Sequence, residues 1–329
     1  MVRLYTEDVR RFADAYAAKF DLDGIRTRLD NLRIIVKGYS AHENYIDHLK
    51  TILTTELIEA PPSEFHSICD GFKSFKASMS MKFGAKKFYE LVVEALEYDN
   101  ARGYFRCYVP LMGIKTCVYC NAQYAVTFVK RNGKEYAQFE VDHWMSKNKY
   151  PCLSISFYNF VPCCPSCNKH KSSKPLSFSL YTEVPKVIAS GEYNPFIFRI
   201  PDINLSRYLA TFNPALLKME FKSRVSDSSV EKDYDRFAIN EMYELFHDEA
   251  ALTIQRFLFY SDAYREQLKT NYSKLFKSGG IPFDEFVYGV RLNQSEVLSR
   301  PLGKMAQDIR AQLETSSLYS SWLKKKGII

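Results

Sequence analysis

Two pairs of cysteines constrain this sequence more than any other feature. The first pair is Cys117-Val-Tyr-Cys120 and the second is Cys164-Pro-Ser-Cys167. The two-residue gap lets each pair curl around one metal ion, and four thiolates close tetrahedrally on Zn²⁺ without leaving an open position. We therefore expect a structural zinc that is not catalytic. Two alternatives stay open: four unrelated buried cysteines, or Cys163 in the place of Cys164, although only Cys164 has the two-residue spacing to Cys167.

The same region carries nearly all of the net charge. Residues 115–180 hold nine Lys and Arg against three Asp and Glu, which gives +6 of the chain's +7. A modest overall excess permits an acidic partner without requiring one, whereas a concentrated excess favours nucleic acid. On duplex DNA each neutralised phosphate adds about 0.9 to the salt dependence of binding. The lysines that we expect near phosphates are Lys147, Lys149, Lys169, Lys171 and Lys174.

The remaining composition is that of an ordinary globular protein. Of the 329 residues, 46% are hydrophobic and 25% charged, which is enough to bury a sizeable core. No apolar run approaches the roughly 18 residues of a membrane span, and the first residues lack the apolar core of a secretory signal. We expect a soluble, cytoplasmic protein without a membrane partner, in which clustered cysteines bind metal rather than form disulfides.

Patterning divides the chain into three parts and predicts the α+β class. Residues 1–112 and 183–329 have helical periodicity, as in 86–98, 238–268 and 301–313. Between them, in 113–182, residues 122–129 and 135–141 have strand character and flank an Asn-Gly turn at 131–134, which predicts a β-hairpin. The expected protein is mostly helical, with a small core that contains strands and is stabilised by zinc, between two helical parts.

Polar residues beside the cysteines are candidates for chemistry. Asp142 and His143 end the predicted second strand, where an imidazole can deprotonate water and a carboxylate can hold Mg²⁺ or Mn²⁺. Because strand neighbours face opposite sides, both serve one site only if the chain leaves β geometry there. Asn168 follows the second cysteine pair, and Asn159 needs hydrogen-bond partners if it is buried. A plain structural Asp-His pair and two turn asparagines are the alternatives.

The segments Cys117-Val-Tyr-Cys120, Glu140-Val-Asp-His-Trp144, Phe157-Tyr-Asn-Phe-Val-Pro162 and Cys164-Pro-Ser-Cys-Asn-Lys-His-Lys171 together resemble the zinc-knuckle HNH endonucleases. These are also called His-Me finger or ββα-metal nucleases. In that family two strands and a helix form the active site, and paired C-x-x-C motifs bind a structural zinc beside it. The resemblance implies an embedded ββα-metal finger and hydrolysis of phosphodiester bonds, with one strand nicked per site.

The resemblance also implies a role for each matching residue. His143 corresponds to the general base, Asn159 to the asparagine that orients the base and its loop, and Asp142 with Asn168 to the ligands of one catalytic Mg²⁺ or Mn²⁺. Many members carry a second histidine where this chain has Asn168, so His170 becomes a second-ranked ligand or phosphate contact. DNA is the expected substrate, with RNA such as tRNA as the alternative within the same class. A non-catalytic zinc-knuckle binding subunit is the alternative from another class.

A weaker similarity extends along the C-terminal part. Residues 194–196, 237–250 and 300–309 are similar to HNH proteins of bacterial antiphage systems that act beside an ATPase, such as the nuclease subunit of Septu-like systems. This similarity implies an ATPase partner and a role in antiviral defence. The 329 residues hold no G-x-x-x-x-G-K-[ST] loop, so ATP use would have to come from that partner.

Overall fold

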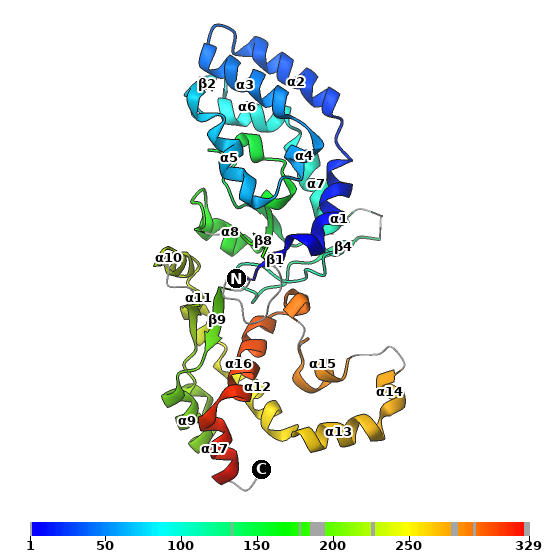
Figure 1. The fold of residues 1–329 in the computed structure, drawn as a ribbon, viewed down its shortest axis with the longest axis vertical. Helices are drawn as coiled ribbons and strands as arrows, with labels where there is room; N and C mark the ends of the chain where they lie inside the picture. Colours follow the sequence, from blue (N-terminus) through cyan, green and yellow to red (C-terminus); the bar gives the residue numbers. More distant parts are fainter. Residues whose placement is uncertain are drawn as a thin grey trace. The chain divides into compact units, whose positions relative to one another are not determined.

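A computed structural model describes residues 2–131, 133, 135–177, 179–184, 195–224, 228–277, 282–291 and 294–325. The chain forms two compact units (Figure 1). Unit A comprises Arg3–Met112 with Ala125–Val187, and unit B comprises Met1–Val2, Gly113–Tyr124 and Ile188–Ile329. The division into 1–112, 113–182 and 183–329 stays a prediction.

Helices dominate the described residues, and the sheets are small two-stranded pairs, in agreement with the predicted α+β class. No helix among the described residues combines the length and apolar character needed to cross a membrane.

In its described residues, unit A is a set of short amphipathic helices with four small strand pairs. Its helices are α1 (Thr6–Ala17), α2 (Leu22–Ile35), α3 (Ser40–Ile52), α4 (Thr55–Ile58), α5 (Phe65–Asp70), α6 (Phe88–Ala95), α7 (Tyr98–Tyr108) and α8 (Pro165–Lys171). Its strands are β1 (Leu4–Tyr5), β2 (Lys82–Phe83), β3 (Lys86–Lys87), β4 (Thr127–Val129), β5 (Glu135–Ala137), β6 (Glu140–His143), β7 (Phe160–Cys163) and β8 (Tyr181–Thr182). Strand β1 pairs in parallel with β8, while β2 with β3, β4 with β5 and β6 with β7 are antiparallel. Helices α2, α3 and α6 pack together (Figure 1).

The single helix predicted over 86–98 is wrong in its extent. Helix α6 ends at Ala95 and α7 begins at Tyr98, because Glu97 takes a backbone φ of 59°, in the left-handed region. That region interrupts a right-handed helix. Leu96 is nonetheless buried together with Phe88, so the apolar periodicity correctly indicated the face that packs inward.

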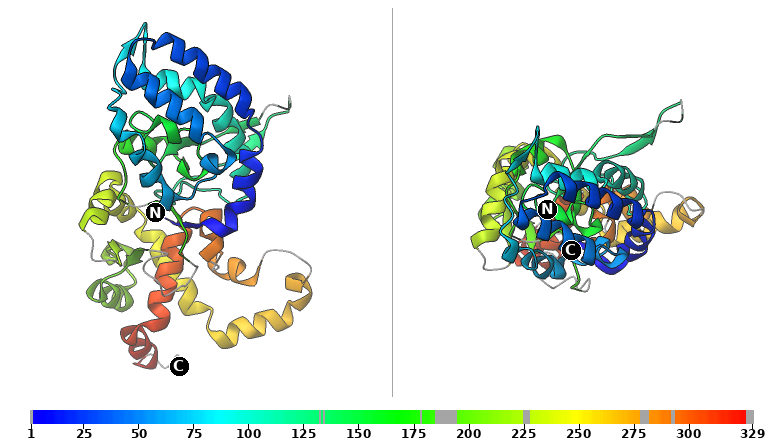
Figure 2. Two further views of the ribbon diagram at one scale, coloured as in Figure 1. Left: turned by 45° about the horizontal axis from the view of Figure 1, so that its top comes forward. Right: turned by 90° about the horizontal axis from the view of Figure 1, so that it is seen from above.

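The predicted β-hairpin is confirmed, but both strands are shorter than expected, and β4 covers only Thr127–Val129 of the predicted 122–129. Strands β4 and β5 pair with Phe128 opposite Tyr136, and the ribbon extends away from the helices of unit A (Figure 2). Asn132 and Lys134 of the turn lie outside the described residues. The strand predicted over 135–141 breaks after Ala137, and β6 then pairs with β7 instead of β4. The period-2 pattern continues across the break, which is why the sequence did not reveal it.

Unit B combines one strand pair with a run of helices. Its elements are β9 (Phe196–Arg199), α9 (Asp202–Thr211), β10 (Glu220–Ser223), α10 (Ser228–Phe237), α11 (Ile239–Glu244), α12 (His247–Phe259), α13 (Asp262–Asn271), α14 (Ser273–Lys277), α15 (Phe283–Tyr288), α16 (Gly303–Thr315) and α17 (Ser317–Lys325). Helix α16 packs on β9 and α12. The helix predicted over 301–313 corresponds to α16, whereas the one predicted over 238–268 is divided among α11, α12 and α13.

Asn121, which follows the first cysteine pair, organises the start of α16 within unit B. It is fully buried and has a backbone φ of 52°, a conformation that Asn tolerates better than most residues. Its Oδ1 accepts the backbone N–H of Lys304 at 2.8 Å, and its Nδ2 donates to Thr116 Oγ1 at 2.8 Å. Leu302, the N-cap residue of α16, supplies no side-chain acceptor. Asn121 therefore caps this helix from a distant part of the sequence.

We expect Asn121→Ala to lower the free energy of unfolding by about 2–3 kcal/mol. The substitution removes a helix cap and leaves buried polar groups without partners. Asn121→Gly relieves the left-handed backbone but restores no hydrogen bond, so it should recover only about 1 kcal/mol of that loss. Urea unfolding followed by circular dichroism measures both variants. Full recovery by the glycine would contradict the capping role.

Candidate functional site

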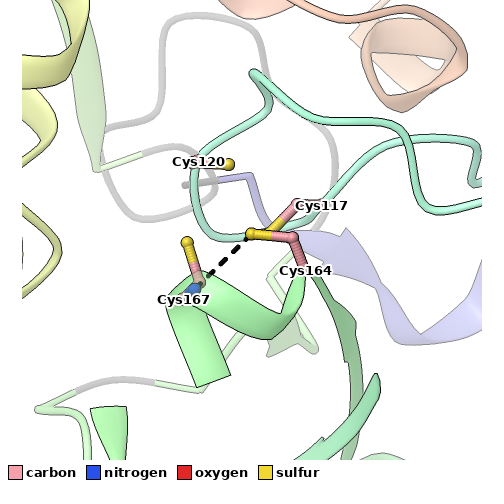
Figure 3. Close-up of side chains that lie close together, drawn as sticks. All are labelled: Cys117, Cys120, Cys164 and Cys167. Carbon is pink, nitrogen blue, oxygen red and sulfur yellow. Dashed lines mark hydrogen bonds between the residues drawn. The ribbon is translucent and has the colours of Figure 1, made fainter. Parts of the chain in front are cut away.

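The four cysteines of the two C-x-x-C pairs come together. Cys117, Cys120, Cys164 and Cys167 are all buried, and their Sγ atoms lie within 4.8 Å of one another (Figure 3). A tetrahedral zinc with bonds of about 2.3 Å requires sulfur atoms separated by about 3.8 Å, so this group can hold zinc. The backbone N–H of Cys167 donates to Cys164 Sγ at 3.5 Å, an interaction that favours a thiolate.

Cys163 is not part of this group. Its Sγ donates to the carbonyl of Glu140 at 3.8 Å, along the pairing of β6 with β7. Burial raises the pKa of the Cys163 thiol well above its usual value, which disfavours the thiolate that zinc requires. The group of four thus contains Cys164, as the two-residue spacing indicated.

Two strands and a helix follow one another at the second cysteine pair. In the β6 and β7 pairing, Asp142 lies opposite Val161 and His143 opposite Phe160. Helix α8 begins directly after β7, with Cys164 as its N-cap residue. We expected the chain to leave β geometry at Asp142. Instead the strand continues through His143, and both residues still line one cavity because the strand ends there.

Asn159 holds the loop between β6 and β7, as expected for a buried asparagine that needs partners. It is fully buried, and its Oδ1 accepts the backbone N–H of Met145 at 2.8 Å. Its Nδ2 donates to the carbonyls of Met145 at 3.0 Å and Leu153 at 2.9 Å. One side chain therefore joins the beginning and the end of the loop that carries Ser154.

His143 is held from three sides. Its Nε2 lies 2.9 Å from the carbonyl oxygen of Ser154, so this nitrogen carries the proton and donates. Nδ1 is then the nitrogen with the free lone pair. The ring packs between Tyr98 and Phe160, with ring centroids 5.2 Å and 5.1 Å away. These contacts determine both the tautomer and the orientation of the imidazole.

The surroundings of His143 favour its neutral form. Burial lowers the pKa of this histidine to about 3, and the nearby charges of Lys147 and Lys171 act in the same direction. The hydrogen bond to Ser154 opposes the shift without cancelling it. At neutral pH the imidazole is therefore uncharged, and its Nδ1 carries no proton.

The position predicted for Lys171 is wrong. We expected it on a phosphate-binding surface, but its side chain is completely buried at the end of α8. Its Nζ lies 3.0 Å from Asp142 Oδ2 and donates to the carbonyl of His143 at 2.6 Å. A buried carboxylate within reach recruits the ammonium, since a buried ion is tolerated only when it is paired. The carboxylate of Asp142 is thereby already bound to a cation.

Asn168 and Glu140 form the second polar pair of the site. Asn168, on α8, donates from Nδ2 to a carboxylate oxygen of Glu140, on β6. In this orientation the amide oxygen of Asn168 remains the atom suited to a cation. Glu140 and Asp142 are two residues apart on one strand, which places their side chains on the same face.

These groups line one cavity of about 660 Å³ in unit A. Its acidic lining residues are Glu140 and Asp142, its amide lining residues are Asn148 and Asn168, and His143 lies among them. Its basic residues are Lys147 together with Arg102 and Arg106 of α7. Asp142, His143 and Asn168 of the motif therefore share one cavity, and an arginine pair from outside the motif joins them.

Sequence reasoning missed Arg102 and Arg106. They lie four residues apart on α7, and Tyr98 lies four residues before Arg102, so all three share one helix face. That spacing was the available signal. Within a helical segment, however, it is equally typical of a solvated face.

Of the remaining residues predicted to contact phosphate or metal, some line the cavity and others lie on the surface. Lys147 lies in the cavity with its Nζ 3.7 Å from the ring centroid of Tyr98. Its pKa is lowered, first by burial and then by the charge of Arg102. Lys149, Lys169 and Lys174 are exposed, and their role as phosphate contacts stays a prediction. His170 is exposed on α8 and is not among the described residues that line the cavity.

Comparison with known proteins gives no match: no protein-family model, curated protein sequence or solved structure matches this chain. The interpretation of the site therefore depends on its own residues.

We expect one zinc per chain, bound by the four-cysteine group. Cys167→Ala should abolish stoichiometric zinc and lower the melting temperature, because three thiolates hold the ion less well and structural zinc contributes to folding. Cys107→Ala, at an exposed cysteine outside the group, is the matched control and should keep its zinc. Elemental analysis of the purified proteins decides between the outcomes. Equal zinc content in both variants would contradict the assignment.

We expect Lys171→Met to destabilise the protein by about 3–5 kcal/mol, because it leaves the buried Asp142 carboxylate without its cation. Combining it with Asp142→Asn removes the unpaired charge and should restore most of that loss. Lys174→Met, at an exposed lysine on the same segment, should change stability by less than about 0.5 kcal/mol. Urea unfolding without added divalent cations measures all three. A single variant as stable as the double variant would contradict the role of the ion pair.

Proposed function

We propose that this protein is a metal-dependent endonuclease of the HNH type that hydrolyses phosphodiester bonds in DNA, nicking one strand per site. The observation that supports it most is the state of His143. A neutral imidazole with one nitrogen bound to Ser154 and the other free lies in a cavity with carboxylates and arginines. This combination suits attack of water on a phosphate ester.

In this mechanism His143 Nδ1 takes the proton of the attacking water. Ser154 keeps the other nitrogen protonated, and the rings of Tyr98 and Phe160 limit rotation of the imidazole. Asn159 maintains the loop that presents the Ser154 carbonyl. A positioned general base contributes about 10² to 10⁴ in rate.

The residues that would hold the catalytic Mg²⁺ or Mn²⁺ are Asp142 and Asn168, with Glu140 on the same strand face. Their oxygen donors are of the type that these cations prefer. Once bound, the cation would supply positive charge to the phosphoryl group and the leaving oxygen. Lys171 already neutralises Asp142, so the cation would share that carboxylate with an ammonium.

Two observations favour a second candidate, a non-catalytic nucleic-acid-binding subunit. The ion pair of Lys171 with Asp142 and the low pKa of His143 both describe groups that are stable without a metal or a substrate. A binder needs only the basic residues of the cavity. It would bind nucleic acid with strong salt dependence, and no divalent cation would produce cleavage.

A partner and a cellular role also belong to this proposal. The similarity of residues 237–250 and 300–309 to nuclease subunits of Septu-like antiphage systems supports an ATPase partner that restrains the nuclease. Co-purification of an ATPase with the tagged full-length chain from its natural host would test this interaction.

The decisive experiment is relaxation of supercoiled plasmid in Mg²⁺ or Mn²⁺. His143→Ala should reduce nicking at least about 10²-fold, since it removes the general base. It should leave zinc content unchanged. His247→Ala, at a partly exposed histidine of unit B, is the control and should nick as the unsubstituted protein does.

Total RNA assayed in parallel distinguishes an RNA nuclease from a DNA nuclease. Equal nicking by the His143 variant would overturn the proposed mechanism. An unsubstituted protein that binds both nucleic acids but cleaves neither would support the binding-subunit candidate.

A further inference from the structure

Helix α7 presents one face to the cavity of unit A. Tyr98, Arg102 and Arg106 follow at four-residue intervals, and all three line the cavity that contains Asp142 and His143. Tyr98 contacts the imidazole, so the same helix face both packs on the proposed base and carries two arginines beside it. Both arginines follow Tyr98 along α7, toward the C-terminal end of the helix.

Positive charges gather at this wall. Lys147 Nζ lies over the Tyr98 ring, and Arg102 is close enough for its charge to contribute to the lowered pKa of Lys147. Bringing like charges together costs free energy, and an anionic ligand recovers it. The site therefore has the electrostatic character of a binding place for anions.

The acidic groups nearby cancel this positive charge only in part. Arg102 pairs with Asp99 at 3.1 Å, but the Asp99 side chain is 86% exposed, and exposed pairs are worth about 0.2–1 kcal/mol. A phosphate can therefore displace it. The carboxylate of Asp142 is bound by Lys171, so this pair adds no net charge to the region. Glu140 is the remaining carboxylate of the cavity, and it accepts from Asn168.

We propose that Arg102 and Arg106 bind backbone phosphates of a nucleic-acid strand, adjacent to the bond that is presented to His143. This inference rests on the proposed function of the site, and it assigns the binding of the substrate to the α7 wall of the cavity. Arginine suits the task because its planar guanidinium can donate two parallel hydrogen bonds to one phosphate. Phosphate contacts of this kind position the strand without reading its sequence.

The test measures binding separately from cleavage. A fluorescent duplex DNA is titrated with the His143→Ala protein at increasing salt, without Mg²⁺, and anisotropy gives the affinity. Adding Arg102→Gln and Arg106→Gln should weaken binding about tenfold or more and reduce the salt slope by about 1.8, which corresponds to two lost phosphate contacts. A single-stranded RNA of equal length, with an expected reduction of about 1.4, shows which nucleic acid is preferred.

Two further variants make the result specific. Arg102→Lys with Arg106→Lys keeps the charge, so the salt slope should return while part of the affinity stays lost. Arg26→Gln is the matched control, because Arg26 is 38% exposed and pairs with Asp23 three residues earlier, as Arg102 is 39% exposed and pairs with Asp99. It should bind as the parent does.

The outcomes separate the two proposals. An unchanged salt slope in the double glutamine variant overturns the phosphate-binding wall, even if the unsubstituted protein nicks plasmid. A reduced slope together with an unsubstituted protein that cleaves nothing supports the wall and removes the nuclease assignment. An equal reduction of the salt dependence of binding in Arg26→Gln would overturn the specific role of α7.

Discussion

The buried contact of Lys171 with Asp142 is the interaction on which the geometry of the site depends. Its ammonium also binds the carbonyl of His143, so one side chain joins the end of α8 to the end of β6. Both elements are short, with only seven and four residues, and neither has much packing surface of its own. Because a broken buried pair costs several kcal/mol, helix and strand keep their separation, and with it the relation of Asn168 to Glu140.

The same contact determines the electrostatics. A fixed positive charge beside His143 helps to keep the imidazole neutral, and it compensates a carboxylate that would otherwise be buried without a partner. Arginines of α7 add further positive charge without adding a new buried ion, since they are only partly buried. The cavity thus combines an uncharged imidazole with a cationic wall, and the two properties are compatible because nearby positive charges disfavour the imidazolium ion.

Local spacing explains what the sequence could predict. The gap within each C-x-x-C pair is encoded by neighbouring residues, and the four cysteines do form a group suited to zinc. Asn159 was predictable as a loop-holding residue because an amide in an apolar segment needs buried partners. Lys171 was not predictable, because its burial depends on a carboxylate on another element. The break after Ala137 and the arginines of α7 were missed for the same reason: each depends on tertiary pairing that a local pattern does not contain.

The cavity wall formed by α7 changes what should be regarded as the smallest functional piece of this chain. Residues 98–106 precede both cysteine pairs, yet they supply an aromatic contact to His143 and two of the three basic residues that line the cavity. A fragment beginning after Met112 would retain every residue that the motif singles out and still lack one side of its site. A transferable piece of this chain accordingly includes α7 together with β6, β7 and α8, because the segments of the motif alone lack the two arginines of that wall.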